Sequence, residues 1–457
     1  MEVCLQDVLN AREARVRRQQ SMLAEHRAPL LCFTMNIAGP IKTSDLVERG
    51  FHAGLALLDS QLPQERILCR DICVFSTGCE AMFSVSMPAK EIKVLCESIE
   101  ETHPLGRLFD MDVLDIDGKK LEREKERCCI ICGAPGRACA ASRAHPLAQL
   151  QAVTRQIFTG FFRDADQTHV GNCAVQSLIA EVHTTPKPGL VDRRNSGSHK
   201  DMDIHMFEAS AHTLQPYFSK CVQIGQDTAH LPPEKTFSLL RDAGVQAEEN
   251  MYRTTGGVNT HKGAIYTLGV LCGSIGRLWT AGKPIANAQD IFSECARIVH
   301  FSAEADFANA DGKTAGERLY LEYGIRGIRG EIADGLPSVK NIGLPRFRQA
   351  LDQGFSKNDA GVFALLHFIA NTTDTNLHRR GGLDGANWAR ESVHRLLTAT
   401  PYPTKAQVQA LDDAFIMRNL SPGGCADLLA VTYFLYDVCH SYGIIPFLAN
   451  RQMSPQM

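Results

Sequence analysis

One stretch decides how the first third of the chain is expected to fold: His103-Pro-Leu-Gly-Arg-Leu-Phe-Asp-Met-Asp-Val-Leu-Asp115. Polar and apolar residues alternate in it with the period of two that is typical of a strand with one buried face. On such a strand Phe109, Met111 and Val113 face a core, while Asp110 and Asp112 lie together on the opposite face. The stretch therefore predicts a strand that carries two neighbouring carboxylates.

Two carboxylates held this close repel each other, and a cation between them relieves the repulsion. Magnesium that carries a phosphate is the usual occupant of such a pair in nucleotidyl transfer. Arg107 precedes the strand, and the turn Gly39-Pro40-Ile-Lys42 brings a second cation. We therefore expect Asp110, Asp112 and Arg107 to be catalytic, with Mg²⁺ on the two aspartates and Lys42 on phosphate. The alternative is a half-exposed strand with two solvated acids.

Soft metal ligands are concentrated just after this strand. Cys129, Cys132, Cys139 and His145 are spaced as Cys-x2-Cys-x6-Cys-x5-His. Four such ligands could close a tetrahedral zinc site. The alternative is a set of reduced cysteines in a tight loop, with the histidine capping a helix.

A further cationic feature lies on the first expected helix, residues 5–26. Arg12, Arg15 and Arg18 follow one another at i, i+3 and i+6, so they share one broad face. Three guanidinium groups on one face could hold a polyphosphate or an acidic partner, and we expect Arg15 and Arg18 to bind phosphate. Plain surface charge is the alternative.

The composition is that of an ordinary globular chain, with 44% apolar and 22% charged residues among 457. The formal net charge of −3 argues against a nucleic-acid-binding protein, because such proteins usually contain a strongly basic domain. We find no run of about 18 apolar residues that would predict a membrane span, and no apolar core of a secretory signal near the start. We therefore expect a cytoplasmic protein whose sixteen cysteines are reduced.

The periodicity of the apolar residues changes near residue 160. Short strand-like runs and two helical stretches precede this point, and longer runs of helical period follow it. We expect an α+β domain over residues 1–165 and a larger all-α domain over residues 166–457, joined where Gly160, Asp164 and Asp166 interrupt the pattern. The expected strands are 30–37, 73–76, 82–87 and 107–116, and the expected helices are 5–26, 89–101, 174–183, 207–218, 262–279, 288–299, 362–372, 387–397 and 426–442.

The motifs of the first domain, in this order, resemble the holo-acyl-carrier-protein synthase family of citrate lyase (CitX). They are Ala-Arg12-Glu-Ala-Arg15-Val-Arg-Arg18-Gln19, Gly39-Pro40-Ile-Lys42, His103-Pro-Leu-Gly-Arg107-Leu-Phe-Asp110-Met-Asp112-Val, and Arg127-Cys-Cys129-Ile-Ile-Cys132 with Cys139 and His145. The resemblance covers about residues 5–158. It implies transfer of a phosphoribosyl-dephospho-coenzyme A group to a serine of the citrate lyase acyl carrier protein, with release of diphosphate. Ala141 stands where the family commonly has arginine, which leaves the role of that segment open.

Six segments of the second domain place polar residues beside Gly or Pro at the edges of expected helices, where free backbone amides bind anions. They are Glu181-Val-His-Thr-Thr-Pro-Lys187-Pro-Gly-Leu-Val-Asp192, Ser198-His199-Lys200-Asp201-Met-Asp203, Thr255-Gly-Gly-Val-Asn259-Thr-His261-Lys262-Gly263, Gly327-Ile-Arg329-Gly-Glu331, Asp374-Thr-Asn376-Leu-His-Arg379-Arg380-Gly-Gly382 and Asn419-Leu-Ser421-Pro-Gly-Gly424-Cys-Ala-Asp427. Each alone could be an ordinary cap, turn or solvated loop, but six exceed what a helical bundle needs.

Two sets of candidate residues follow from these segments. Basic, amide, hydroxyl and glycine positions suit a triphosphate and its nucleotide, and acidic positions suit metal binding or acid–base work. The candidate binding residues are Lys187, His199, Lys200, Asn259, Lys262, Arg329, Asn376, Ser421, Gly423 and Gly424, and the candidate carboxylates are Asp192, Asp201, Glu331, Asp374 and Asp427.

Together the six segments resemble the triphosphoribosyl-dephospho-coenzyme A synthase family (CitG), over about residues 175–435. The resemblance implies that ATP and 3′-dephospho-coenzyme A are joined, with loss of adenine, to 2′-(5″-triphosphoribosyl)-3′-dephospho-coenzyme A. Magnesium and the lysines are then expected to hold the triphosphate, while the identity of the base among the carboxylates stays open. Cys425 stands where the family usually has serine, which is a mild change.

The two resemblances name consecutive steps. We therefore expect one bifunctional transferase that makes the activated prosthetic group of citrate lyase and loads it onto the carrier. Two alternatives stay open: the same chemistry could serve the carrier protein of malonate decarboxylase, or the first domain could act only as a zinc-stabilised docking module for the carrier.

Overall fold

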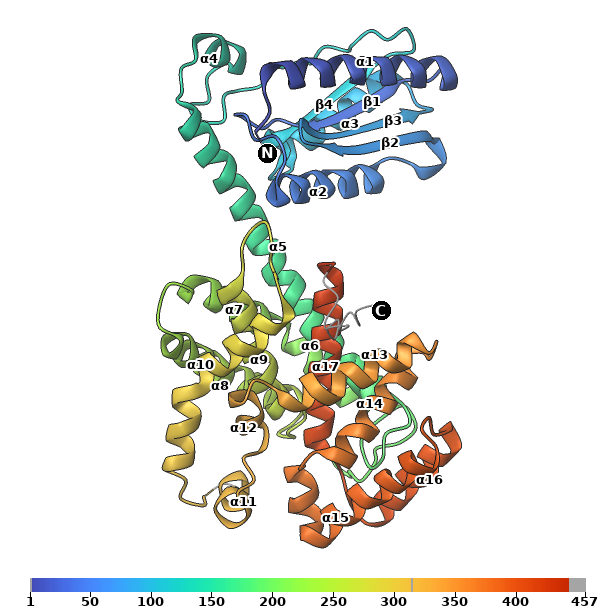
Figure 1. Ribbon diagram of the computed structural model, residues 1–457, viewed down its shortest axis with the longest axis vertical. Coiled ribbons are helices and arrows are strands. Elements are labelled where there is room, and N and C mark those ends of the chain that lie inside the picture. Colours follow the sequence, from blue (N-terminus) through green and yellow to red (C-terminus); the bar gives the residue numbers. More distant parts are fainter. Residues whose placement is uncertain (1, 314, 444–457) are drawn as a thin grey trace, which may run out of the picture. The chain divides into compact units, whose positions relative to one another are not determined.

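The computed structural model describes residues 2–313 and 315–443 (Figure 1). Two compact units make up the chain. The N-terminal unit consists of Met1–Ala165 and Ala281–Lys283, and the helical unit consists of Asp166–Thr280 and Pro284–Met457. The first unit combines strands with helices and the second is built from helices, so the expected fold class is confirmed. The end of the expected second domain, 444–457, lies outside the described residues.

A four-stranded antiparallel sheet in the order β2-β3-β1-β4 forms the centre of the N-terminal unit. All four expected strands are present, and β2 is longer than expected because its pairing with β3 begins at Ile67. The strands are β1 (Leu30–Met35), β2 (Ile67–Phe75), β3 (Gly78–Val85) and β4 (Phe109–Leu114), and the helices are α1 (Leu5–His26), α2 (Asp45–Gln61) and α3 (Ala89–Thr102), with 3-10 turns η1 (Gln64–Arg66) and η2 (Gly106–Leu108).

The two faces of this sheet carry different side chains. Phe33 and Phe109 are buried on one face, where Phe33 stacks on Phe51 of α2 with ring centroids 5.0 Å apart. Helix α1 covers the opposite face, as Figure 1 shows. The alternation along β4 therefore places Asp110 and Asp112 on the face that α1 covers.

A single long helix, α5 (Leu147–His183), follows the short α4 (Gly136–Ser142). Gly160, Asp164 and Asp166, where the apolar pattern is interrupted, all lie within α5, which runs through them without a break. One glycine costs a helix only about 1 kcal/mol relative to alanine, which tertiary packing readily offsets.

The helical unit contains the rest of α5 and twelve further helices among the described residues. The expected helix 207–218 is two helices, because Pro216 has no N–H to donate and clashes with the preceding turn. The expected set does not include α8, α11, α12, α13 or α16. The helices are α6 (Ile204–Thr213), α7 (Gln215–Thr228), α8 (Pro233–Thr254), α9 (Lys262–Leu278), α10 (Ala288–Ala308), α11 (Ala315–Tyr323), α12 (Gly327–Ala333), α13 (Leu344–Asp352), α14 (Lys357–Asn371), α15 (Thr375–Ala399), α16 (Lys405–Met417) and α17 (Gly423–Ser441), with a π turn η3 (Val339–Gly343).

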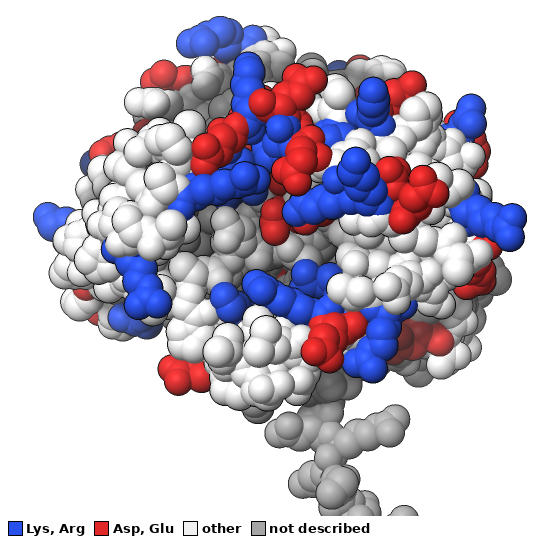
Figure 2. Space-filling view, turned by 90° about the horizontal axis from the view of Figure 1, so that it is seen from above, with Lys and Arg blue, Asp and Glu red and all other residues white. Residues whose placement is uncertain are grey.

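Helices α9, α14 and α17 are buried over most of their surface and form the core of this unit. None of the described helices is long and apolar enough to cross a membrane. On the face seen in Figure 2, basic and acidic side chains are interspersed, so that face has no field of one sign that would steer a polyanion toward it.

Candidate active site

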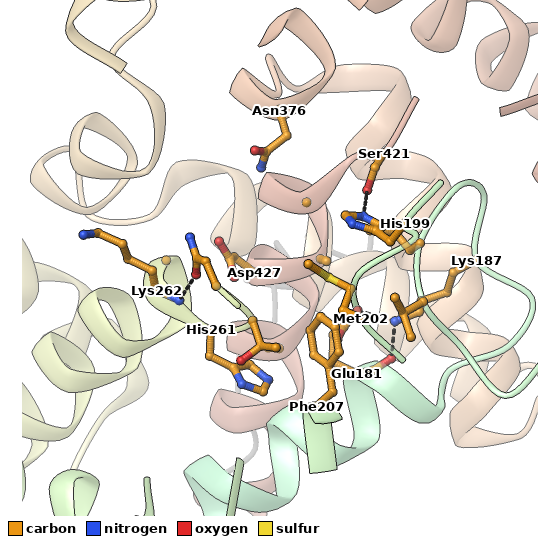
Figure 3. A pocket seen from close by; sticks show the side chains of 18 of the residues that line it. Glu181, Lys187, His199, Met202, Phe207, His261, Lys262, Asn376, Ser421 and Asp427 are labelled. Carbon is orange, nitrogen blue, oxygen red and sulfur yellow. Dashed lines mark hydrogen bonds and ion pairs between the residues drawn. The ribbon is translucent and has the colours of Figure 1, made fainter. Parts of the chain in front are cut away.

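A cavity of about 360 Å³ in the helical unit gathers most of the site residues expected in that unit (Figure 3). Its walls come from α5, α6, the loop that joins them, and the starts of α9, α15 and α17. The expected residues that line it are Lys187, His199, Asp201, Asn259, Lys262, Asn376, Ser421, Gly423 and Asp427. The fold thus brings together residues from five of the six segments.

Three helices begin at this cavity. Helix α9 begins at Lys262, α17 begins at Gly423, and α15 begins one residue before Asn376. The buried carboxylate of Asp374 ties two of these ends together, since it accepts hydrogen bonds from the amides of Asn376 (2.7 Å) and Cys425 (2.8 Å). Aligned dipoles at helix starts favour anions, so this wall suits phosphate groups. Part of its capacity is already used, because Asp374 occupies the amides of Asn376, Leu377 and Cys425, and the Lys262 amide donates to Asn259 over 3.1 Å.

His199, Arg380 and Ser421 form a hydrogen-bonded chain on another wall. Arg380 donates to Nδ1 of His199 over 3.1 Å, because a guanidinium group has donors only. Burial and then the charge of Arg380 lower the pKa of His199 to about 4, so the ring is neutral near pH 7. Its proton therefore lies on Nε2, which donates to Ser421 Oγ over 2.9 Å. The hydroxyl proton of Ser421 is left to donate to a ligand.

Lys187 lines the cavity as a member of a buried ion pair. Its side chain is 1% exposed and donates to the carboxylate of Glu181 and, over 2.7 Å, to the backbone oxygen of Glu181. Burial raises the pKa of Glu181, and the Lys187 charge opposes that rise. The charge of Lys187 is thus largely offset before any phosphate binds.

Asp427 lies on α17 and faces the first turn of α9. Gly263 stands at the point of contact, and a Cβ atom there would overlap with Asp427 Oδ2. Burial, followed by the nearby charges of Glu181 and Asp374, raises the pKa of Asp427 to about 8. A carboxyl group with such a pKa can exchange a proton near neutral pH, as general acid–base catalysis requires.

His261 precedes α9 and is buried against Phe207, with the rings edge to face and their centroids 5.0 Å apart. Thr260 donates to Ser210 Oγ (2.8 Å), which leaves the Ser210 hydroxyl to donate to Nδ1 of His261 (2.8 Å). Burial lowers the pKa of His261 to about 3, so the ring is neutral and carries its proton on Nε2. Among the described residues this Nε2 has no hydrogen-bond partner. A ligand acceptor at Nε2 would remove a cost of about 1–3 kcal/mol.

The other expected residues of this unit lie outside the cavity lining. Asp192 holds the loop after α5, since it accepts hydrogen bonds from the amides of Lys187 (2.9 Å) and Arg194 (2.6 Å). Glu331 accepts hydrogen bonds from the amide (2.7 Å) and hydroxyl (3.0 Å) of Ser338. These two carboxylates and that of Asp374 hold the backbone in place. The residues outside the lining are Asp192, Lys200, Arg329, Glu331, Asp374 and Gly424.

Sequence reasoning did not select several residues that shape the cavity: Glu181, Met202, Phe207, His261, Arg379 and Arg380. All except Phe207 stand inside the six quoted segments. The sequence therefore contained these residues in the right segments but gave no reason to choose them over their neighbours. Asp412 stands in no segment, and its buried carboxylate ties the loop after α5 to α16 through the Gly189 amide (2.8 Å) and Arg194 (2.5 Å).

In the N-terminal unit four of the expected residues lie at the sheet face that α1 covers: Arg15, Arg18, Asp110 and Asp112. The strand register places Asp110 of β4 and Glu80 of β3 in one row across β1. Arg15 bonds to Glu80 over 2.5 Å, and Arg18 bonds to Glu80 and, over 2.8 Å, to Asp71. Both arginines are therefore paired with acids of the sheet.

Asp110 and Asp112 lie on one face of β4, as the alternation predicts. Lys120 Nζ is 2.6 Å from Asp112 Oδ2, and Arg127 Nη1 is 3.9 Å from Asp110 Oδ1. Partial desolvation and then the charge of Asp112 raise the pKa of Asp110. Lys120 and Arg127 thus already offset part of the repulsion between Asp110 and Asp112, which a bound metal ion was expected to relieve.

The two expected phosphate-site cations, Arg107 and Lys42, donate to backbone carbonyls. Arg107 bonds to the oxygen of Cys128, and Lys42 bonds to that of Ile37 over 2.6 Å. Arg127 donates to two more carbonyls beside the start of β4, over 2.8 Å each. Arg107 and Arg127 together fasten the cysteine-bearing loop to β4.

The cysteine–histidine cluster forms as the spacing predicts. The ligand atoms of Cys129, Cys132, Cys139 and His145 all lie within 4.8 Å of one another, and among the described residues no other group of Cys, His, Asp and Glu could hold a metal in this way. Amides of Cys132 and Ile131 lower the pKa of Cys129 to about 6, which favours the thiolate that binds metal. Three thiols and an imidazole fit Zn²⁺.

Comparison with known proteins relates each unit to a family. Residues 3–161 match the CitX family, described as apo-citrate lyase phosphoribosyl-dephospho-CoA transferase, and residues 167–444 match the CitG family, described as ATP:dephospho-CoA triphosphoribosyl transferase. Protein CitXG of Haemophilus influenzae is 36% identical over 451 residues, which cover 95% of this chain and 96% of that protein. The chain belongs to the CitXG family.

Further relatives agree with membership of the CitXG family. Protein CitXG of Leuconostoc mesenteroides is 33% identical over 461 residues, covering 94% of this chain and 96% of that protein. The 2-(5''-triphosphoribosyl)-3'-dephosphocoenzyme-A synthase of Klebsiella pneumoniae is 41% identical over 265 residues, covering 57% of this chain and 87% of that protein. Both resemblances read from the motifs are confirmed, and the chain is a transferase.

Proposed function

We propose that this bifunctional transferase builds the prosthetic group of citrate lyase and attaches it to its carrier. The helical unit converts ATP and 3′-dephospho-coenzyme A to 2′-(5″-triphosphoribosyl)-3′-dephospho-coenzyme A and adenine. The N-terminal unit then transfers the phosphoribosyl-dephospho-coenzyme A group to a serine of the citrate lyase acyl carrier protein and releases diphosphate. One observation carries the first assignment: three helix starts meet beside Asp427, a carboxyl group whose pKa lies near 8.

Asp427 acts as the base in the helical unit. The 2′-oxygen of dephospho-coenzyme A forms a bond to C1 of the ATP ribose, and its proton passes to Asp427. The bond from C1 to adenine breaks, and adenine leaves with the bonding pair and takes up a proton. Positive charge builds on the ribose as adenine departs, and a carboxylate beside it stabilises that charge.

The triphosphate of ATP binds at the starts of α9, α15 and α17. Lys262 and Arg379 add positive charge there, and the free hydroxyl proton of Ser421 adds a donor. The magnesium expected with the nucleotide would neutralise part of the triphosphate charge, and Asp201, which is exposed at this cavity, is the carboxylate placed to hold it.

The adenine of ATP binds at the other side of the cavity. Figure 3 shows Met202 and Phe207 together there, away from Lys262 and Asn376. These side chains offer apolar contact, and the unpartnered Nε2 of His261 fits a ring nitrogen of the base. A hydrogen bond to that nitrogen would also assist its departure as a leaving group.

The carrier serine attacks the α-phosphorus of the triphosphoribosyl group in the N-terminal unit, and diphosphate leaves. Asp110 and Asp112 are proposed to hold Mg²⁺, because carboxylates are hard ligands and 53% of the Asp110 side chain is exposed. Such an ion would neutralise the charge that builds on the phosphate oxygens. Lys120 and Arg127, which lie against these carboxylates, are placed to contact the same phosphates.

The cysteine–histidine cluster is proposed to be a structural zinc site. Four protein ligands leave no open position, which is typical of structural rather than catalytic zinc. The site would order the loop that Arg107 and Arg127 fasten to β4. We place the reaction in the cytoplasm, where ATP is available and such thiols stay reduced.

The test of the proposed function is adenine release by the purified protein. Adenine should form only when ATP and dephospho-coenzyme A are both present, and mass spectrometry should find the triphosphoribosyl product. Apo-carriers of citrate lyase and of malonate decarboxylase should then be offered separately, and only the first should be labelled efficiently. Adenine formation from ATP alone would contradict the proposal.

A further inference from the structure

The helical unit contains a second cavity, also of about 360 Å³. Its walls come from α7, α8, α9, α10 and α12. It shares two lining residues with the first cavity, Lys262 and Gly263, which form the first turn of α9. The partition between the cavities at this turn thus includes a residue without a side chain.

The walls of the second cavity are largely apolar. They include Phe237, Leu240, Tyr266, Val270 and Ile328, with the rings of Phe237 and Tyr266 set edge to face. The hydroxyl of Tyr217, which also lines the cavity, donates to a backbone carbonyl over 3.0 Å. An occupant therefore meets more hydrocarbon than hydrogen-bonding groups.

Charged groups line the same cavity in pairs. Arg329 is 2.9 Å from Asp306, and Lys262 is 2.8 Å from Glu248. Arg241 adds one more cation, so three basic groups stand against two acidic ones. This balance suits a ligand with a small negative charge and does not suit a triphosphate.

We infer that the second cavity binds the pantetheine arm of dephospho-coenzyme A, with the diphosphate of that substrate beside Arg241 and Arg329. The inference rests on the proposed function, in which the 2′-hydroxyl of this substrate must meet C1 of ATP beside Asp427. Asp427 lies against Gly263, and Gly263 lines both cavities. Two substrates that enter from two cavities would meet at this turn.

The adenine of ATP is the other group that an apolar cavity could take. The first cavity already offers Met202, Phe207 and the unpartnered donor of His261 to a base. The pantetheine arm is long and flexible, with a gem-dimethyl group and short methylene runs between two amides, a hydroxyl and a thiol. Apolar walls with a small number of polar contacts match that chemistry better than they match a purine.

Gly244 on α8 provides a direct test, because a Cβ atom there would meet only the Tyr217 hydroxyl, at an ordinary 3.5 Å. Gly244→Phe puts a ring into the cavity, and replacing a helical glycine favours the helix, so the variant should fold. Gly244→Ala is the matched control. Val245→Trp, at a position that is 54% exposed at the rim, blocks the cavity independently.

The measurement is the rate of adenine release against the concentration of each substrate, together with dephospho-coenzyme A binding by calorimetry. Gly244→Phe and Val245→Trp should raise the KM and Kd for dephospho-coenzyme A by about tenfold or more, while the KM for ATP changes less than about twofold. Gly244→Ala should behave as the wild type. ADP is dephospho-coenzyme A without its pantetheine arm, so it should be a poor acceptor of the triphosphoribosyl group. Its activity with the blocked variants should equal its activity with the wild type, because it does not use the second cavity.

Either of two results would overturn the inference. One is an unchanged affinity for dephospho-coenzyme A in both blocked variants, and the other is a raised KM for ATP, which would place the ATP base in this cavity. Failure of the proposed function is distinguishable, because a wild-type protein that releases no adenine can still be tested for dephospho-coenzyme A binding with the same variants.

Discussion

The carboxylate of Asp427 on α17 lies against Gly263 in the first turn of α9, so closely that a Cβ atom at position 263 would overlap with it. This contact brings a titratable group to the start of a helix that opens on both cavities of the helical unit. Helix starts favour negative charge, whereas burial and the charges of Glu181 and Asp374 oppose it. The balance leaves a carboxyl group that can change its protonation state near neutral pH.

The first prediction concerns Asp427 as the base. Asp427→Asn should lower the rate of adenine release by roughly 10²–10⁴-fold, the usual contribution of a general base. In the wild type, kcat/KM should rise with pH through a midpoint near 8, because only the ionised carboxylate accepts a proton. A pH profile that is flat between 6 and 9, or an active Asn variant, would remove Asp427 from this role.

The same group has a consequence for stability. The pKa of Asp427 is about 4 in the unfolded chain and about 8 in the folded chain. Because the folded state therefore holds this proton more tightly, the free energy of unfolding falls as the pH rises from about 4 to about 8. Asp427→Asn should therefore have a higher Tm than the wild type at pH 8.5, and the difference should shrink toward pH 4. Calorimetry at both pH values checks this, and a variant of lower Tm at pH 8.5 would contradict it.

We expect Lys187 to contribute mainly to the stability of the helical unit and less to substrate binding. Lys187→Met leaves the buried Glu181 carboxylate without its partner and should destabilise the helical unit by about 3–5 kcal/mol. The double variant Lys187→Met/Glu181→Leu should regain part of that loss, and Lys200→Met, at an exposed position, is the control. If Lys187→Met unfolds like the wild type and only raises the KM for ATP, Lys187 is a phosphate ligand instead.

The cysteine–histidine cluster predicts about one zinc ion per chain in elemental analysis. Cys132→Ser should lose the metal and lower the Tm of the N-terminal unit alone. Cys128→Ser, which changes an exposed thiol outside the cluster, should keep both. Zinc retained by Cys132→Ser would show that the cluster does not bind it.

Asp110 and Asp112 are predicted to serve transfer and not synthesis. Asp110→Asn or Asp112→Asn keeps the side-chain shape and should slow carrier loading by about 10²–10³-fold, as expected when one electrostatic contributor is lost. Adenine release should stay at the wild-type rate, so the triphosphoribosyl intermediate should accumulate. Asp117→Asn, at an exposed position beyond β4, is the control. Normal loading by both variants would leave the pair as a solvated strand face.

Residues 1–165 and 166–457 are proposed to act as separate enzymes. A fragment for the second should begin near Gly160, because Asp166 accepts hydrogen bonds from Trp279 (2.7 Å) and Tyr442 (2.8 Å), which must be retained. Residues 160–457 should release adenine at a rate close to that of the whole chain. A folded fragment without activity would show that the N-terminal residues complete the site.

The sequence predicted those features of the fold that depend on the spacing of residues within one short segment. Helix α1 has the expected bounds, and the two-residue period placed Asp110 and Asp112 on one face of β4. The cysteine spacing predicted a cluster because its ligands lie within one short segment. Helices α2 and α8 were missed, although both carry an apolar stripe of helical period at least as clear as that of α1.

The roles of the carboxylates depend on contacts between segments far apart in the sequence. Asp374 and Asp192 looked like catalytic acids, yet their oxygens are occupied by backbone amides. Asp427 differs from them because burial, followed by the charges of Glu181 and Asp374, raises its pKa to about 8 in the folded chain. Neither its raised pKa nor its place between the two cavities could be read from a single sequence.

Intact-mass analysis of the acyl carrier protein tests the central claim most directly. The whole chain, ATP, dephospho-coenzyme A and the citrate lyase apo-carrier are incubated together. The account predicts that the carrier gains the mass of one phosphoribosyl-dephospho-coenzyme A group, with one adenine and one diphosphate released for each carrier modified. A carrier that stays unmodified while the triphosphoribosyl product accumulates would contradict the claim that this one chain both makes and attaches the group.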